Sequence, residues 1–215
     1  FPILVIVALA VSLVIKSFLV QFFYIPSGSM ENTLQVNDRV AVNKVPFIGK
    51  SIGRGDVVVF RDPDNWLPEP YVADENKYLA KVKDAFVAVG VLPNPTKQYL
   101  VKRVIGVAGD KVECCSKGKK LMINGVEIDE PYIFAGNKAS DLDFNITVPE
   151  GKIWVMGDHR GASADSRFHT DDIHKGMVPL SSVVGRATVV VWPFNHLKFL
   201  SVGSDLSKVV INNTK

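Results

Sequence analysis

The sequence predicts a mainly β protein: a domain of antiparallel β-sheet with a small inserted β lobe, preceded by an N-terminal transmembrane helix. Three observations support this fold class. Runs of β-branched and aromatic residues bounded by Gly, Asp or Pro recur along the chain, which is typical of strands. An Asn-Gly pair at 124–125 separates two short apolar runs and suits a type I′ hairpin turn. The first 15 residues carry no charge.

The N-terminal segment is predicted to be a membrane anchor over residues 1–23. The uncharged stretch is followed by Lys16 and an aromatic-rich run. A spanning helix needs about 20 apolar residues, but Lys16 could reach the interface while the aromatic rings lie at headgroup depth. A buried core helix would show a polar face, and a cleavable signal peptide an Ala-x-Ala-like site, and neither is present. Because Phe1 has no basic flank before it, we expect the native segment to extend further.

The strand-like runs divide the rest of the chain into a main β domain and a lobe. Strands are predicted at 57–60, 99–107, 153–156 and 183–192, and less clearly at 38–45. The main domain is assigned to 24–111 and 149–201, and the small lobe, with a hairpin at 121–128, to 112–148. Residues 202–215 are interpreted as a loosely held tail.

Residues 62–98 differ from their surroundings. They contain five prolines and several charges, and 74–89 has a helical pattern. We interpret the segment as a surface insertion with one short amphipathic helix. It could cover one edge of a functional site, touch lipid, or be a tolerated loop, and the last is favoured.

Composition excludes some classes of function. The formal net charge is only +3 and no long Lys/Arg block exists, so no nucleic-acid partner is expected. The two cysteines, Cys114 and Cys115, are adjacent and do not have metal-ligand spacing. Because disulfide geometry is hard to reach between neighbours, reduced thiols are favoured; a strained vicinal disulfide or a bridge to another chain is the alternative.

Ser29 is the most informative candidate for chemistry. It lies in the run Ile-Pro-Ser-Gly-Ser-Met at 25–30, directly after the predicted anchor. A serine needs a base to become a nucleophile. Four histidines, His159, His169, His174 and His196, leave a Ser-His-Asp triad conceivable, although no G-x-S-x-G pattern surrounds Ser29.

A lysine could serve as the base instead. Lys102 interrupts the apolar strand 99–107, next to Arg103. Strand alternation directs Lys102 and Arg103 to opposite faces, so one of them must point toward a less solvated face. Spacing alone nevertheless favours a half-exposed strand in which both cations reach water.

The loop at 156–167 is a third cluster. It combines Asp, Arg and Ser pairs with small residues, which indicates a buried, hydrogen-bonded knot rather than a solvated turn. Its Gly-Asp-His fragment resembles metallophosphoesterase loops. Those sites need further His/Asp clusters, which the sequence lacks, so no metal is expected.

Together these clusters resemble the bacterial type I signal peptidases, which use a Ser-Lys dyad. The matching pieces occur in the family's order: Ile-Pro-Ser-Gly-Ser-Met at 25–30 with Thr33 and Leu34, Arg-Gly-Asp-Val-Val-Val-Phe at 54–60, Val-Lys-Arg-Val-Ile-Gly at 101–106 with Gly109 and Asp110, and Gly-Asp at 157–158 through Ser-Ala-Asp-Ser-Arg at 163–167. They cover about a third of the chain and bracket most of it.

The resemblance implies a role for each matching residue. Ser29 aligns with the nucleophile and Lys102 with the general base, which reverses the reading from spacing alone. The hydroxyl of Ser27 aligns with the partner of the Ser29 N–H in an oxyanion hole. The remaining matches are Ser163, which would orient the lysine amine, the supporting ion pair of Asp165 with Arg167, and the structural acid Asp158. Candidates for the substrate pocket flank the catalytic pair in sequence: Phe23, Ile25, Pro26 and Val101.

The resemblance also implies a function. It is that of a membrane-anchored serine endopeptidase that removes N-terminal signal peptides from exported preproteins and prefers small residues at −1 and −3. No cofactor is implied. The expected partners are signal peptides, membrane lipid and, transiently, the translocon. The catalytic domain would lie on the extracytoplasmic face of the bacterial cytoplasmic membrane.

Other functions remain as alternatives. A self-cleaving Ser-Lys protein would carry a DNA-binding domain or cleavable linker where this chain has an apolar segment. The endoplasmic-reticulum relatives use His as base. A non-catalytic, membrane-tethered β module would not need both Ser29 and Lys102.

The chain departs from the pattern of many relatives at two places. They have Pro where Asn32 stands, and they have Asn-Arg-Asp-Asn where this chain has His-Arg-Gly-Ala at 159–162. The second difference puts in doubt any side-chain contact that relatives make at the position of Ala162.

Overall fold

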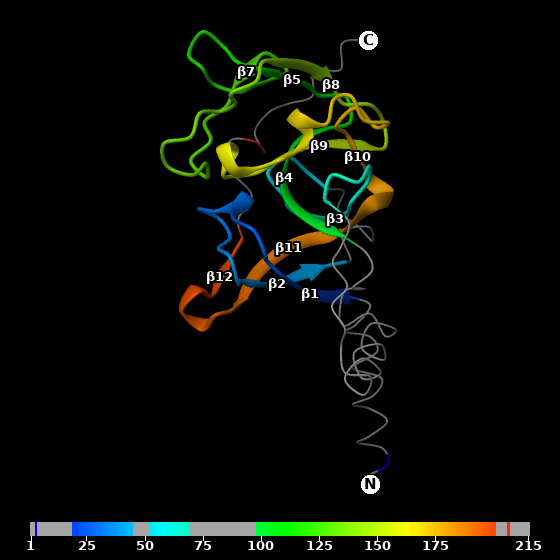
Figure 1. Cartoon of the computed structure of the whole chain (residues 1–215), viewed down its shortest axis with the longest axis vertical. Coiled ribbons are helices and arrows are strands. Elements are labelled where there is room, and N and C mark those ends of the chain that lie inside the picture. Colours follow the sequence, from blue (N-terminus) through cyan, green and yellow to red (C-terminus); the bar gives the residue numbers. More distant parts are fainter. Residues whose placement is uncertain (1–2, 4–18, 45–51, 69–97, 201–205, 207–215) are drawn as a thin grey trace.

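The structure is a computed structural model, and it describes residues 3, 19–44, 52–68, 98–200 and 206 (Figure 1). Two antiparallel sheets account for the strands of this part, which confirms the mainly β prediction. Figure 1 shows β1, β2, β11 and β12 gathered at one end and the second sheet at the other. None of the helices among the described residues is long and apolar enough to cross a membrane.

The first sheet has the order β1-β2-β11-β3-β4-β9-β10, with β12 paired to β11. Its strands are β1 (Val20–Tyr24), β2 (Arg39–Asn43), β3 (Val57–Arg61), β4 (Tyr99–Val107), β9 (Lys152–Met156), β10 (Val178–Pro179), β11 (Val183–Trp192) and β12 (Lys198–Phe199). The second sheet has the order β7-β6-β5-β8, built from β5 (Lys111–Cys114), β6 (Met122–Ile123), β7 (Val126–Glu127) and β8 (Phe144–Thr147). Its strands lie almost entirely within the range assigned to the lobe.

The apolar runs form strands because they are covered on both faces. The side chains of Val58, Val59 and Phe60 in β3 have no exposed surface. One core cluster lies between β1, β2, β3 and β11, and another lies beside β4 and β9. A third packs the second sheet against Trp154. The β6–β7 turn has positive φ at Asn124 and Gly125, as the Asn-Gly hairpin prediction requires.

The predicted anchor was wrong at its C-terminal end. Residues Val20–Tyr24 form strand β1, which pairs antiparallel with β2. The side chains alternate, with Gln21 and Phe23 buried and Phe22 and Tyr24 exposed, because one face of the strand packs on the core. Hydropathy alone does not separate an apolar strand from the end of a helix. Most of the predicted anchor, and the predicted helix at 74–89, lie outside the described residues.

Of the predicted tail, the structure describes Leu206 alone. Leu206 is fully buried in the cluster that supports the second sheet. The description of 202–215 as loosely held is therefore wrong at this residue, because its apolar side chain finds a place in the core.

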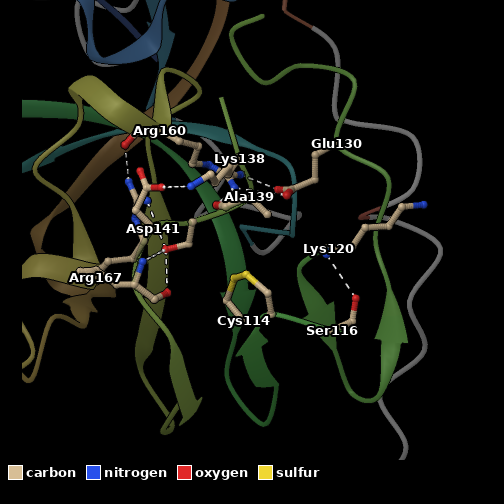
Figure 2. The surroundings of a disulfide bond; sticks show 12 residues. Cys114, Ser116, Lys120, Glu130, Lys138, Ala139, Asp141, Arg160 and Arg167 are labelled. Carbon is tan, nitrogen blue, oxygen red and sulfur yellow. Dashed lines mark hydrogen bonds and ion pairs between the residues drawn. A yellow bond between two sulfur atoms is a disulfide. The ribbon is translucent and has the colours of Figure 1, made fainter. Parts of the chain in front are cut away.

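The cysteines also differ from the favoured expectation. Cys114, at the end of β5, is joined to Cys115 by a disulfide bond (Figure 2). Reduced thiols were favoured because disulfide geometry is hard to reach between neighbours, and the vicinal disulfide, which was the alternative, is the state that the structure shows. Cys114 is buried and Cys115 packs against the same core.

Candidate active site

Ser29 lies in a short 3-10 turn, η1 (Gly28–Met30), directly after β1. Met30 and Leu34 are buried and hold this turn in the core beneath β1 and β2. The serine is 9% exposed, so its hydroxyl is largely shielded from solvent.

Lys102 reaches Ser29 from the middle of β4. Its Nζ donates a hydrogen bond to Ser29 Oγ over 2.6 Å. The lysine is only 4% exposed, and burial lowers its pKa from 10.5 to about 8, against the raising effect of the carboxylates of Asp165 and Asp158. A neutral amine within hydrogen-bond distance of a hydroxyl can take its proton, so the pair is suited to nucleophilic attack.

Both cations of β4 are buried, contrary to the reading from spacing alone. Arg103 is 2% exposed, and its Nε and Nη2 donate to the carboxylate of Asp158 over 2.8 and 2.6 Å. Alternation predicts which face a side chain takes but not whether the face is covered. Here the turn of Ser29 and the loop after β9 cover β4.

The loop after β9 is the buried knot that the sequence predicts. Asp165 and Arg167 form a two-point ion pair with N···O distances of 2.8 and 2.9 Å, and the Gly157 N–H donates to Asp165 over 2.9 Å. Asp158 has no exposed surface and also accepts a hydrogen bond from the hydroxyl of Thr33. These contacts join β9 to β4 and to the segment just after Ser29.

Ser163 is buried nearby, but the contact expected of it is absent. Its Oγ has no hydrogen-bond partner in the described part of the chain, Lys102 included. The hydroxyl is turned toward Gly157, where an added Cβ would lie 2.2 Å from it.

Ser27 lies at the mouth of the site. Its side chain is exposed, and its Oγ is 3.5 Å from Ser29 Oγ. Both serines line one cavity of about 280 Å³ together with Lys102.

The same cavity contains the four predicted pocket residues, Phe23, Ile25, Pro26 and Val101. The rings of Phe23 and Tyr99 meet edge to face at 5.1 Å. Sequence reasoning missed the further lining residues Tyr24, Met30, Leu67, Tyr99, Leu100, Ala162 and Ala164. Most of them lie next to the motifs in sequence, which could have indicated them. Leu67 instead lies in the predicted insertion, away from every motif.

Further missed residues connect the turn of Ser29 to the rest of the molecule. The His159 N–H donates to the carbonyl of Ser29 over 3.1 Å, and its ring pairs with Glu31 and stacks on Phe134. Asn32, at positive φ, donates to the carbonyl of Tyr132 over 3.0 Å. The departures at 32 and 159 thus have contacts of their own.

The histidines do not form a triad with Ser29. In the described part of the chain each ring nitrogen Nδ1 pairs with a carboxylate: His159 with Glu31, His169 with Asp172, His174 with Asp64 and His196 with Asp38. The part of the chain that the structure describes contains no group of three or more His, Cys, Asp or Glu side chains that could hold a metal ion.

Comparison with known proteins gives consistent findings. A family model described as signal peptidase, peptidase S26, matches residues 1–192. The probable signal peptidase I of Mycobacterium leprae (strain TN) is 39% identical over 220 residues, which cover 90% of this chain and 75% of that protein. The signal peptidase I of Bacillus amyloliquefaciens is 32% identical, covering 90% of this chain and 85% of that protein. A solved signal peptidase I from Enterococcus faecalis V583 is 27% identical, with a TM-score of 0.39, and the match covers 65% of this chain and 98% of that one.

Proposed function

Because the chain belongs to the signal peptidase family, peptidase S26, we propose that it is a serine endopeptidase that removes N-terminal signal peptides from exported preproteins by Ser-Lys dyad chemistry. The observation that carries the proposal is the 2.6 Å hydrogen bond between Lys102 Nζ and Ser29 Oγ, formed in a buried site. The bond supplies the nucleophile with a base.

The proposed reaction proceeds through an acyl-enzyme. Neutral Lys102 accepts the Ser29 proton while Oγ attacks the scissile carbonyl carbon. The resulting oxyanion is stabilised by the Ser29 N–H and the Ser27 hydroxyl, and one such donor is typically worth about 3 kcal/mol. Protonated Lys102 then gives its proton to the leaving amine as the C–N bond breaks. The neutral lysine next activates a water, which attacks the ester and releases Ser29.

The loop after β9 is proposed to support the dyad. Asp165 and Arg167 hold the loop against β9, and Asp158 neutralises Arg103 beside the base. Ser163 is proposed to orient the lysine amine during the reaction, which requires its hydroxyl to turn from Gly157 toward Nζ. The proposed preference for small residues at −1 and −3 of the substrate rests on the family resemblance, and Phe23, Ile25, Pro26 and Val101, which line the cavity beside the dyad, are the proposed pocket residues.

The bacterial cytoplasmic membrane is the proposed location, with the catalytic domain on the extracytoplasmic side and a transient encounter with the translocon. The uncharged N-terminal segment supports a membrane anchor. Five exposed aromatic residues, which we call the aromatic face, support contact between the domain and lipid: Phe22, Tyr24, Trp192, Phe194 and Phe199. Rings with this exposure are suited to the headgroup region of a bilayer.

The proposal is tested by cleavage of a preprotein in detergent. Ser29→Ala and Lys102→Ala are each expected to abolish cleavage after a small residue, because each removes one half of the dyad. Ser181→Ala and Lys117→Ala, at exposed positions, are the matched controls and should cleave normally. A serine-directed acylating inhibitor should label Ser29. Full activity of Lys102→Ala would contradict the mechanism, and absence of labelling would favour a non-catalytic module.

A further inference from the structure

The first residues of the predicted insertion form a fixed turn beside the active site. The carboxylate of Asp62 accepts hydrogen bonds from the backbone N–H groups of Trp66 and Leu67, both over 2.8 Å, and from that of Asp64 over 3.3 Å. One carboxylate thus fixes the backbone of the whole turn through charge-assisted hydrogen bonds.

Side chains also hold the turn in place. Trp66 is 8% exposed, meets Phe60 of β3 edge to face at 5.9 Å and stacks on His169 at 4.4 Å. Asp64 accepts hydrogen bonds from the backbone N–H of His174 over 3.1 Å and pairs with its ring over 2.7 Å. The turn is therefore anchored both to the central sheet and to the loop 169–174.

Leu67 is the residue that this turn presents to the active site. Its side chain lines the cavity that also contains Ser29 and Lys102, while 37% of the residue is exposed. With this much exposed surface, the side chain of Leu67 is not part of the buried core, so core packing does not explain a leucine here. The turn that contains Leu67 is held by the central sheet and by the loop 169–174, so the leucine forms a defined part of the cavity wall.

We propose that Leu67 is a specificity-determining residue, whose side chain limits the size of the substrate residue accepted beside the scissile bond. The inference rests on the proposed function and assigns to the start of the insertion the role of covering one edge of the site. Apolar contacts in a pocket of this kind discriminate weakly per methylene, by about 10- to 200-fold. A leucine is large enough to exclude a branched side chain by this amount.

The test compares Leu67→Ala with the unchanged full-length protein on preproteins that carry Ala, Val or Leu at −1 or at −3, each varied separately. Leu67→Ala is expected to raise kcat/KM for Val or Leu at one of these positions about tenfold relative to Ala, and Leu67→Trp to lower it. Asp62→Ala, which releases the backbone of the turn, is expected to change the profile in the same direction as Leu67→Ala.

The matched control is Leu142→Ala, because Leu142 is similarly exposed, at 39%, and does not line the cavity. Its substrate profile should equal that of the unchanged protein. Thermal unfolding of each variant checks that the fold is retained. A profile of Leu67→Ala that is unchanged at both positions, with normal cleavage after Ala, would overturn the inference and leave the proposed function intact. Failure of the unchanged protein to cleave any substrate would instead contradict the proposed function.

Discussion

In the proposed mechanism, the reactivity of Ser29 depends on the protonation state of a single neighbour, Lys102. Burial is the largest influence on that lysine and lowers its pKa to about 8, while Asp165 and Asp158 raise it and Arg167 lowers it. At neutral pH about a tenth of the amine is then neutral, which is enough for a base that regenerates in each cycle.

This balance predicts the pH dependence of cleavage. Below about pH 8 the rate constant kcat/KM is expected to rise about tenfold per pH unit, and above that pH to level off, because the neutral amine is the active form. Asp165→Asn removes the carboxylate that raises the lysine pKa, so the rise should shift to lower pH. A profile of kcat/KM from pH 5 to 10 with a signal-peptide substrate measures both. No change in rate between pH 6 and 8 would contradict Lys102 as the base.

The identities of Ser29 and Lys102 were predictable because each belongs to a short motif. The burial of Lys102 and Arg103 was not predictable from spacing, because it depends on a turn and a loop from distant parts of the chain. The rotamer of Ser163 and the contacts of Asn32 and His159 depend in the same way on neighbours that no local pattern reveals. Leu67 had no motif at all.

At the level of elements, one buried ion pair connects three parts of the site. Arg103 of β4 meets Asp158, which follows β9, and Asp158 also accepts from Thr33 beside the turn of Ser29. The side chains of Arg103 and Asp158 are 2% and 0% exposed, so neither charge has solvent as an alternative partner.

Removal of Asp158 should therefore cost far more than removal of an exposed partner. Asp158→Ala is expected to lower the free energy of unfolding by about 3–5 kcal/mol, because Arg103 keeps a buried charge without its carboxylate. The control Asp141→Ala breaks the exposed pair with Lys138 and should cost less than about 1 kcal/mol. Denaturant unfolding measures both values. An equal decrease in the free energy of unfolding in the two variants would show that the buried pair contributes no more to stability than the exposed pair.

The strands at 57–60 and 183–192 were predictable because these runs are rich in β-branched and aromatic residues and are bounded by Asp or Pro. The hairpin at 121–128 was predictable because Asn-Gly adopts positive φ at little cost. Strand β1 was missed because aromatic and aliphatic residues suit both a strand and the end of a membrane helix. The pairing of β1 with β2 decides between strand and helix, and this pairing joins segments that no local sequence pattern relates.

At the scale of the whole molecule, the aromatic face is contributed by β1, β11 and β12, which β2 joins, and by Phe194, whose ring meets that of Trp192 at 4.7 Å just after β11. The register aligns Tyr24 with Arg39 and Arg39 with Trp192, and in the next row Phe22 with Ala41, Ala41 with Val189 and Val189 with Phe199. Opposite residues share one face of a sheet. These strands lie at the end of the described molecule away from the second sheet (Figure 1), and β1 leads directly to the turn of Ser29. A bilayer against this face would lie close to the dyad.

The full-length protein in lipid vesicles therefore should bring one tryptophan into contact with lipid. Trp192 is 46% exposed on the aromatic face, whereas Trp66 and Trp154 are 8% and 0% exposed. Lipids brominated near the headgroup are expected to quench part of the tryptophan fluorescence, and Trp192→Phe to remove that quenched part while the remaining emission stays. Trp66→Phe is the matched control and should keep the quenching. Equal quenching of the protein with and without Trp192, or no quenching at all, would exclude this face as the lipid contact.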